Sequence, residues 1–228
     1  MKITYTGWLA VVLLLGLLYP TISQATHVRA GVITTRRIPS ATSQLTYEIT
    51  LTAYYDEVGG RIAAQQTPTV EFCFGDGVRA TVARQLPVQL INGGTSSINI
   101  YRTIHTYPAP EAYKISARIQ NRNDNTRNIN GGNSINVPFY VASTILVNAE
   151  LGPNSTPVLL NAPLDSGRVG QRFCYNPAAF DADGDSLAYR SADVVPAQSS
   201  DSNPCQQLNV PGYRYPDAYS TTSEAGAP

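Results

Sequence analysis

The amino-acid sequence predicts an all-β protein whose main part is an antiparallel β-sandwich. From Leu45 to Tyr55, the residues Tyr47, Ile49 and Leu51 continue an every-second-position pattern of apolar side chains. This period is typical of a strand with one buried face, and no convincing helical period appears from Thr26 to about Asn148. About seven such runs within about 120 residues favour an antiparallel sandwich.

Each expected strand is bounded by residues that favour turns. Gly59 and Gly60 follow the second strand, and Gly- and Asn-rich stretches at 92–94 and 130–133 separate later strands. Glycine reaches positive φ without steric cost, and asparagine tolerates it. In chain order, the expected strands cover residues 28–35, 45–55, 68–74, 78–86, 98–106, 113–119 and 135–147.

Composition and charge argue against a nucleic-acid partner. The chain has 16 Lys+Arg and 16 Asp+Glu, with a formal net charge of +0 at pH 7. Such a chain has no electrostatic attraction to phosphate backbones, so no nucleic acid is expected. Charged residues make up only 14% of the chain, which also contains 14 Tyr. This composition is typical of an extracellular β protein with many turns.

Residues 1–25 have the features of a secretory signal peptide. Lys2 supplies the positive charge, residues 8–18 form the apolar stretch, and Ala25 is the small residue expected before a cleavage site. The apolar stretch is too short to span a bilayer; an uncleaved membrane anchor is the alternative. We therefore expect a secreted or cell-surface protein that begins near Thr26 and has no transmembrane segment after signal removal.

The clearest sequence motif is Phe74-Gly75-Asp76-Gly77, which follows the apolar run at residues 69–73. Both glycines can adopt positive φ, and the aspartate can accept hydrogen bonds from backbone N–H groups of its own turn. The motif therefore predicts a tight corner at the end of a strand. A metal ligand at Asp76 is the less favoured interpretation.

His105-Thr106-Tyr107 and, later, Tyr113 complete a larger pattern. Together with F-G-D-G they resemble the PKD (polycystic kidney disease) domain, whose fingerprint is F-G-D-G, then H-x-Y, then G-x-Y-x-V. The resemblance implies an immunoglobulin-like β-sandwich over residues 26–148. It also implies that His105 packs against the strand of Phe74.

The start of the mature chain carries a second resemblance. Residues 27–31 (HVRAG) and 47–56 (YEITLTAYYD) are similar to the N-terminal patterns H-x-x-G-G-E and Y-E-I-T-L-T-x-Y-R-D-C of large Bacteroidetes surface proteins. Ala30 and Tyr55 depart from these patterns, and Glu57 stands where that family has a cysteine. The resemblance implies a role in adhesion or in gliding-motility-associated surface structures.

A linker and a second, incomplete unit are expected beyond the sandwich. Residues 149–157 contain Gly and Pro with no apolar period, which is typical of a linker. Beyond them, G-Q-R-F at 170–173 and D-A-D-G-D-S-L-A-Y at 181–189 resemble a cadherin-like bacterial repeat. Only a few strands can be placed in residues 158–196, fewer than a closed sandwich uses, so this β unit is expected to be partial.

The last part of the chain, residues 197–228, is rich in Ser, Pro, Asp and Thr and has few aliphatic residues after Val210. We expect a low-order tail or the truncated remainder of the repeat, in a chain that is part of a longer protein. A naturally disordered tail is the alternative.

Asp181, Asp183 and Asp185 stand at alternate positions of a glycine-containing loop. Carboxylates placed this densely repel one another unless a cation neutralises them, and Ca²⁺ accepts six to eight oxygen ligands. The spacing excludes an EF-hand. The cadherin-like resemblance implies that Glu150 and Asn154 in the linker complete a calcium site. The alternative is a solvated turn without an ion.

The chain has three cysteines, Cys73, Cys174 and Cys205. An odd number in a secreted protein implies a free thiol, an intermolecular bond or a partner outside the sequence. Cys174 and Cys205 lie in the same later region and are the expected disulfide pair. Cys73 lies on a buried-looking strand, where a lone cysteine behaves as a small apolar side chain.

No motif of nucleophilic, metal-hydrolytic, phosphate-binding or dinucleotide-binding enzymes is present. Neither histidine, His27 or His105, has a catalytic or metal-binding spacing. We therefore expect a non-catalytic secreted or cell-surface spacer and contact module, with an extracellular protein or polysaccharide as partner. The alternatives are an accessory, glycan-binding N-terminal region of a larger secreted hydrolase, and a sugar-binding module in its own right.

Overall fold

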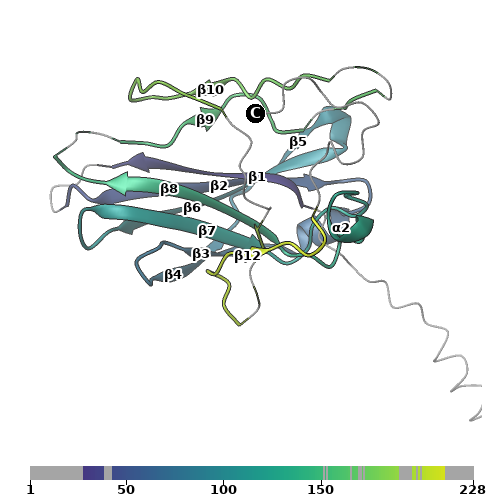
Figure 1. Cartoon of the computed structure of the whole chain (residues 1–228), viewed down its shortest axis with the longest axis horizontal. Helices are drawn as coiled ribbons and strands as arrows, with labels where there is room; N and C mark the ends of the chain where they lie inside the picture. Colours follow the sequence, from purple (N-terminus) through teal and green to yellow (C-terminus); the bar gives the residue numbers. More distant parts are fainter. Residues whose placement is uncertain are drawn as a thin grey trace, which may run out of the picture.

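The computed structural model describes residues 28–38, 43–150, 152, 154–164, 166–168, 171, 173–189, 197–198, 200 and 202–213. These residues are nearly all β or turn, and two four-stranded antiparallel sheets face each other as a sandwich (Figure 1). The predicted fold class, an immunoglobulin-like all-β sandwich, is confirmed. The expected signal peptide at 1–25, and His27, lie outside the described residues.

The order of the strands is that of an immunoglobulin-type sandwich. With the strands lettered A to G, the constant type has sheets A-B-E-D and C-F-G, and this protein adds β4 beside β3. The first sheet has the order β1 (Val28–Arg37), β2 (Thr46–Asp56), β6 (Ser96–Thr106) and β5 (Gln89–Ile91), and the second has β4 (Arg79–Ala83), β3 (Thr69–Cys73), β7 (Glu111–Ile119) and β8 (Phe139–Val147).

Strand boundaries differ from the expected ones where a short strand or a turn intervenes. The three-residue β5 escaped prediction because it is too short to show alternation. It follows a cis peptide bond between Leu86 and Pro87. The expected strand at 135–147 begins only at Phe139, because the residues before it form a turn. Short helical turns lie at α2 (Arg61–Gln65), η1 (Asn92–Gly94) and η2 (Asn130–Gly132).

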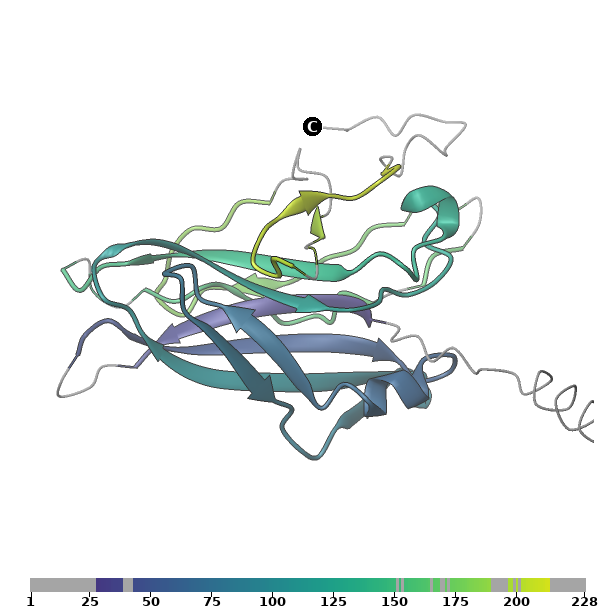
Figure 2. The same ribbon diagram turned by 90° about the horizontal axis from the view of Figure 1, so that it is seen from below.

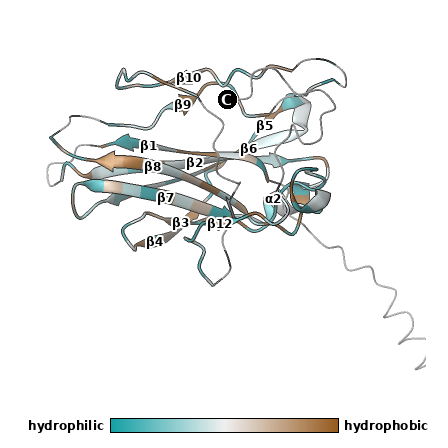
Figure 3. Cartoon of the chain, in the orientation of Figure 1, coloured by the Kyte–Doolittle hydropathy of each residue, from teal (hydrophilic) through white to brown (hydrophobic). Residues whose placement is uncertain are grey.

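The core lies between the two sheets and is built by alternation along the strands. On β2, Tyr47, Ile49 and Leu51 are fully buried, whereas the intervening Thr50 is half-buried on the opposite face. The second sheet contributes Phe72, Val70, Ile115, Ala117, Ile119, Ile145 and Val147 to the same cluster. Figure 3 shows a hydrophobic stretch at the end of β8. No helix in the described ranges is long and apolar enough to cross a membrane.

Tyr113, near the start of β7, fixes the corner that leads into this strand. Its hydroxyl donates a hydrogen bond to the main-chain oxygen of Ala109, four residues earlier, at 3.0 Å. Immunoglobulin-like sandwiches have a tyrosine corner of this kind, in which a tyrosine near the start of strand F bonds back to the backbone. Tyr113, which belongs to the sequence motif, therefore has a structural role in the fold.

Two short strand pairs follow the sandwich and lie against different parts of it. The pair of β9 (Val158–Leu159) and β10 (Ala179–Phe180) lies beside β1 in Figure 1. The pair of β11 (Ala197–Gln198) and β12 (Leu208–Asn209) lies along β8 in Figure 2.

The predicted linker covers the free edge of β1. The main chains of Thr35 and Thr156 meet there. The Thr35 N–H donates to the Thr156 hydroxyl at 2.7 Å, and the Thr156 N–H donates to the Thr35 carbonyl at 3.0 Å. The guanidinium of Arg37 donates to the Gly152 carbonyl at 2.6 Å. Covering an edge strand in this way removes a template for pairing with another chain.

Candidate functional site

The Gly-Asp-Gly corner has the geometry that its residue types predict. Gly75 and Gly77 have φ of +93° and +88°. One oxygen of Asp76, Oδ1, accepts a hydrogen bond from the Val78 N–H at 3.0 Å. A Cβ on Gly75 would lie 2.8 Å from main-chain atoms of Lys114, so the backbone of β7 approaches too closely for any other residue. The corner therefore holds the end of β3 against β7.

Asp76 and His105 are hydrogen-bonded across this corner. The Nε2 atom of His105 lies 2.7 Å from the Oδ2 atom of Asp76, and their side chains are 12% and 5% exposed. The imidazole stacks on the ring of Phe74, with centroids 4.1 Å apart, and meets the ring of Tyr107 edge-on at 4.7 Å. The expected packing of His105 against the strand of Phe74 is therefore present.

The two tyrosines of the motif extend the same cluster. The rings of Tyr107 and Tyr113 stack with centroids 4.2 Å apart, and the Tyr107 hydroxyl donates to the Phe74 carbonyl at 3.3 Å. Burial, with smaller contributions from Asp76 and neighbouring tyrosines, raises the pKa of Tyr107 well above its usual value. A phenol held neutral in this way serves as a hydrogen-bond donor in the core.

The pKa of Asp76 is lowered from its usual value. Burial is the largest single effect and acts to raise the pKa of this carboxyl, but the hydrogen bond and the electrostatic interaction with His105, together with the main-chain hydrogen bonds in the turn, outweigh burial. Asp76 therefore stays ionised through the neutral range and acts as an acceptor for both groups. These contacts support the turn interpretation of the motif over the alternative in which Asp76 binds a metal.

The acidic loop uses its carboxylates as internal acceptors. Asp181 is 9% exposed, and its Oδ1 atom accepts hydrogen bonds from the N–H groups of Asp183, at 2.9 Å, and Asp185, at 3.3 Å. Asp183 Oδ2 accepts from the N–H of Ser155 in the linker at 2.5 Å. The acidic loop and the linker are therefore in contact, as the cadherin-like resemblance implied. The contact is the hydrogen bond from the main-chain N–H of Ser155 to Asp183.

The two predicted calcium ligands in the linker form hydrogen bonds near the end of β8. Asn154 donates through Nδ2 to the Leu146 carbonyl, at 3.1 Å, and the main chain of Glu150 bonds to Asn148. Among the described residues, no group of three or more His, Cys, Asp or Glu side chains is placed to hold a metal ion. The arrangement is that of a loop braced by its own carboxylates, and the calcium site stays a prediction.

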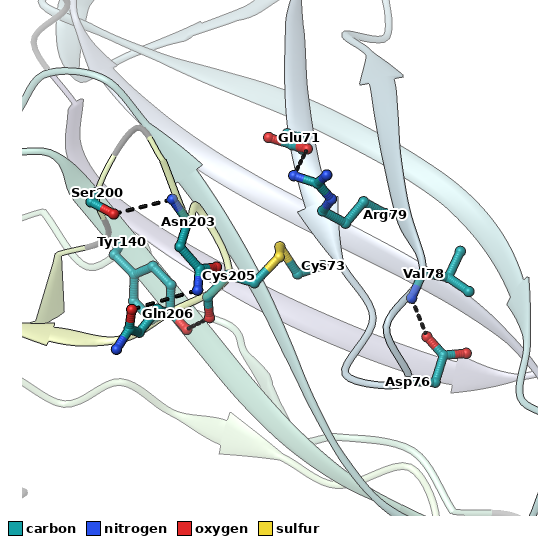
Figure 4. The surroundings of a disulfide bond; sticks show 10 residues. All are labelled: Glu71, Cys73, Asp76, Val78, Arg79, Tyr140, Ser200, Asn203, Cys205 and Gln206. Carbon is teal, nitrogen blue, oxygen red and sulfur yellow. Dashed lines mark hydrogen bonds and ion pairs between the residues drawn. A yellow bond between two sulfur atoms is a disulfide. The ribbon is translucent and has the colours of Figure 1, made fainter.

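The disulfide joins Cys73 to Cys205 rather than Cys174 to Cys205, so the predicted pairing is wrong (Figure 4). The Cα atoms of Cys73 and Cys205 lie 5.6 Å apart, and Cys174 is a free, exposed thiol. The side chains of the neighbours Phe72 and Phe74 point into the core. Because side chains alternate along a strand, Cys73 points to the outer face of the second sheet, where Cys205 lies. The alternation that located the core was the signal that could have placed Cys73 outside it.

Residues 202–213, the C-terminal strap, pack on the sandwich and correct the expectation of a low-order tail for this part of 197–228. The hydroxyl of Tyr140 donates to the Cys205 carbonyl at 3.4 Å, and the ammonium of Lys114 bonds to Gln207 Oε1. At its end, Val210 is 4% exposed and packs with Ile129 and Val137. The strap was missed because its few apolar residues show no period.

Sequence reasoning also missed a polar cleft of about 440 Å³ at one end of the second sheet. It lies between the start of β3 and the end of β7, with Pro204 of the strap on its rim. Its walls carry the hydroxyl of Thr69 and the amides of Gln120 and Asn121, and its lining includes the buried residues Val70 and Ile119. No local motif marks it, because its walls are far apart in the chain.

A search of protein-family models, of curated proteins and of solved structures found nothing that matches this chain.

Proposed function

We propose that the protein is a non-catalytic, secreted or cell-surface module that acts as a spacer and contact domain in adhesion or gliding-associated surface structures. The observation that carries the proposal is the Cys73–Cys205 disulfide, which fastens the C-terminal strap to the sandwich. Structural disulfides persist in oxidising compartments and are rare in the cytosol. The signal-like residues 1–25 and the resemblance to surface proteins support the same location.

The placement of the titratable residues supports a non-catalytic role. The pair most like a catalytic dyad, Asp76 and His105, is 5% and 12% exposed, and its ring is covered by Phe74 and Tyr107. A catalytic base must reach the proton of a bound substrate. The imidazole of His105 instead bonds to the carboxylate of Asp76, which closes the Gly-Asp-Gly turn.

A spacer must resist deformation along its length, and the contacts that fasten the later segments to the sandwich support this role. The strap is fastened by Cys205 on one sheet, and Thr156 is fastened to the edge of the other sheet. The carboxylate of Asp183 links the acidic loop to Ser155. We include calcium in the proposal: an ion held by Asp181, Asp183 and Asp185 would stiffen this joint further.

The test is the location of the protein in the organism that carries the gene. An epitope inserted in the exposed turn near Gly93 allows the protein to be followed in cytosolic, membrane, surface and medium fractions. We expect it in the surface or medium fraction, accessible to added protease on intact cells. Deletion of residues 2–18 should retain it in the cytosol. Cytosolic location of the intact protein would contradict the proposal.

A further inference from the structure

The ladder between β3 and β7 stops before either strand does. It pairs Cys73 with Ser116, Phe72 with Ala117 and, last, Glu71 with Arg118. β3 nevertheless begins two residues earlier and stays paired with β4 there, and β7 stays paired with β8 up to Ile119. Two central strands of one sheet therefore separate while each keeps its outer neighbour.

The main chain of Thr69 faces the gap. Successive residues of an antiparallel strand direct their N–H and C=O groups alternately to the two neighbouring strands. The Pro68 carbonyl accepts from the Arg84 N–H at 2.8 Å, so residue 68 faces β4. Residue 69 then faces β7, and the next rung of that ladder would have been Thr69 with Gln120.

The main chain of Gln120 faces the same gap from the other side. Glu71 pairs with Arg118 across the ladder, so residue 118 and, two residues on, residue 120 face β3. The polar cleft of about 440 Å³ opens where this rung is missing. Its size lies within the range of ordinary ligand sites.

The charges of the cleft balance. Its lining holds one carboxylate, Glu71, and one guanidinium, Arg118. The ion-pair partner of Glu71 is Arg79, outside the lining, at 3.2 Å. The remaining polar groups in the lining are hydroxyls and amides, above the buried side chains of Val70 and Ile119. Such walls suit an uncharged occupant that offers both hydrogen-bond donors and acceptors.

We propose that this cleft binds an extended, uncharged polypeptide segment of a partner protein, whose main chain bonds to the main chains of Thr69 and Gln120. Strand addition uses main-chain groups that a sheet leaves available, with side-chain pockets for selectivity. The facing edges of β3 and β7 each offer one N–H donor and one C=O acceptor. The main chain of an extended peptide presents the same two groups at every second residue along each of its edges. The inference rests on the proposed contact role and names the chemistry of the contact.

A neutral saccharide is the competing occupant, and the substitutions at one position separate the two. Gln120→Ala removes the side-chain amide that a sugar would use and keeps the main-chain N–H. Gln120→Pro removes that N–H as well. Thr69→Pro removes the facing N–H and leaves the β4 ladder intact, because residue 69 does not face β4. Thermal melting of each variant establishes that it folds.

The experiment selects peptides from a displayed random heptapeptide library on the full mature chain and measures the affinity of the synthesised winners. We expect wild type and Gln120→Ala to bind within about twofold of each other and each proline variant to bind about tenfold more weakly, the effect of losing one main-chain hydrogen bond. In the wild type, the peptide should shift the amide resonances of Thr69 and Gln120, a readout that needs no variant.

Three results would overturn the inference: no enrichment of peptides, selected peptides whose affinity is unchanged in folded proline variants, or amide shifts at Thr69 and Gln120 caused by chitotetraose or cellotetraose and not by peptides. The surface location of the protein is measured independently, so failure of peptide binding leaves the spacer role standing, and cytosolic location removes both.

Discussion

Cys73 on the outer face of β3 is bonded to Cys205 on the C-terminal strap, 132 residues later in the chain. The bond therefore closes a covalent loop that contains β4 to β8, whereas β1, β2 and most of β3 precede it in the chain. Crosslinks that close long loops restrict the unfolded chain most, and removal of a native disulfide from a small secreted domain costs a few kcal/mol. The strap adds little apolar contact of its own beyond Val210 and its neighbours.

We predict that Cys205→Ser lowers the free energy of unfolding by about 3–5 kcal/mol, because the unfolded chain regains the freedom that the loop removed. Urea unfolding followed by tyrosine fluorescence measures the change. Cys174→Ser is the matched control, since this thiol is free and exposed, and should change the free energy by less than about 0.5 kcal/mol. Equal effects of the two substitutions would contradict the pairing.

The Asp76–His105 pair predicts a pH dependence of stability. The pKa of Asp76 is lower in the folded protein than its usual 3.8. A depressed folded pKa adds stability that is present above the unfolded pKa and is lost as the pH falls below it toward the folded pKa.

Asp76→Asn should therefore destabilise the protein by about 1–3 kcal/mol at pH 6, where it removes a charged acceptor from a buried pair, and by clearly less at pH 3. Urea unfolding at both pH values measures the difference. Glu111→Gln, on an exposed residue at the start of β7, is the control. A cost for Asp76→Asn that is the same at both pH values would show that the ionised carboxylate contributes nothing.

Gly75 and Gly77 form a matched pair for testing the close approach of β3 and β7. Both have positive φ, but only the Cβ of Gly75 would meet the Lys114 backbone; nothing lies within 4 Å of the other. Gly77→Ala should cost about 1–2 kcal/mol from backbone strain alone. Gly75→Ala should cost about 1–3 kcal/mol more, because the backbone must shift. Thermal or urea unfolding compares them; equal costs would contradict the packing.

The calcium proposal predicts ligand-dependent stability. A cation that binds the folded acidic loop raises the melting temperature with its concentration. We expect a rise in the melting temperature of the mature chain between chelator and millimolar Ca²⁺, and its loss in Asp183→Asn with Asp185→Asn. Magnesium at the same concentration controls for ionic strength. An unchanged melting temperature would leave the carboxylates as main-chain acceptors alone.

The sandwich was predictable because its signals are local and periodic. The alternation along β2 and the glycines of the Gly-Asp-Gly corner reflect burial and backbone sterics within a few residues. The packing of His105 on Phe74 followed only from the family resemblance. The alternation of apolar residues alone predicts a β fold. The motif residues were needed to anticipate this contact between the two sheets.

What escaped prediction depends on contacts between distant parts of the chain. Sequence proximity suggested Cys174 as the partner of Cys205, whereas the fold brings Cys73 under the strap. The cleft between Thr69 and Gln120 arises because a ladder ends, which no residue type marks. The hydrogen bonds of the acidic loop were also not predicted: Asp181 accepts from the main-chain N–H groups of Asp183 and Asp185, and calcium binding at this loop stays a prediction.

Thiol mapping of the protein recovered from the cell surface or medium tests directly whether it is a disulfide-closed module that works outside the cytosol. Maleimide labelling without reductant, followed by proteolysis and mass spectrometry, reports each cysteine. We predict label on Cys174 only and a peptide pair crosslinked through Cys73 and Cys205. Label on Cys73 and Cys205, or a crosslink between Cys174 and Cys205, would contradict it.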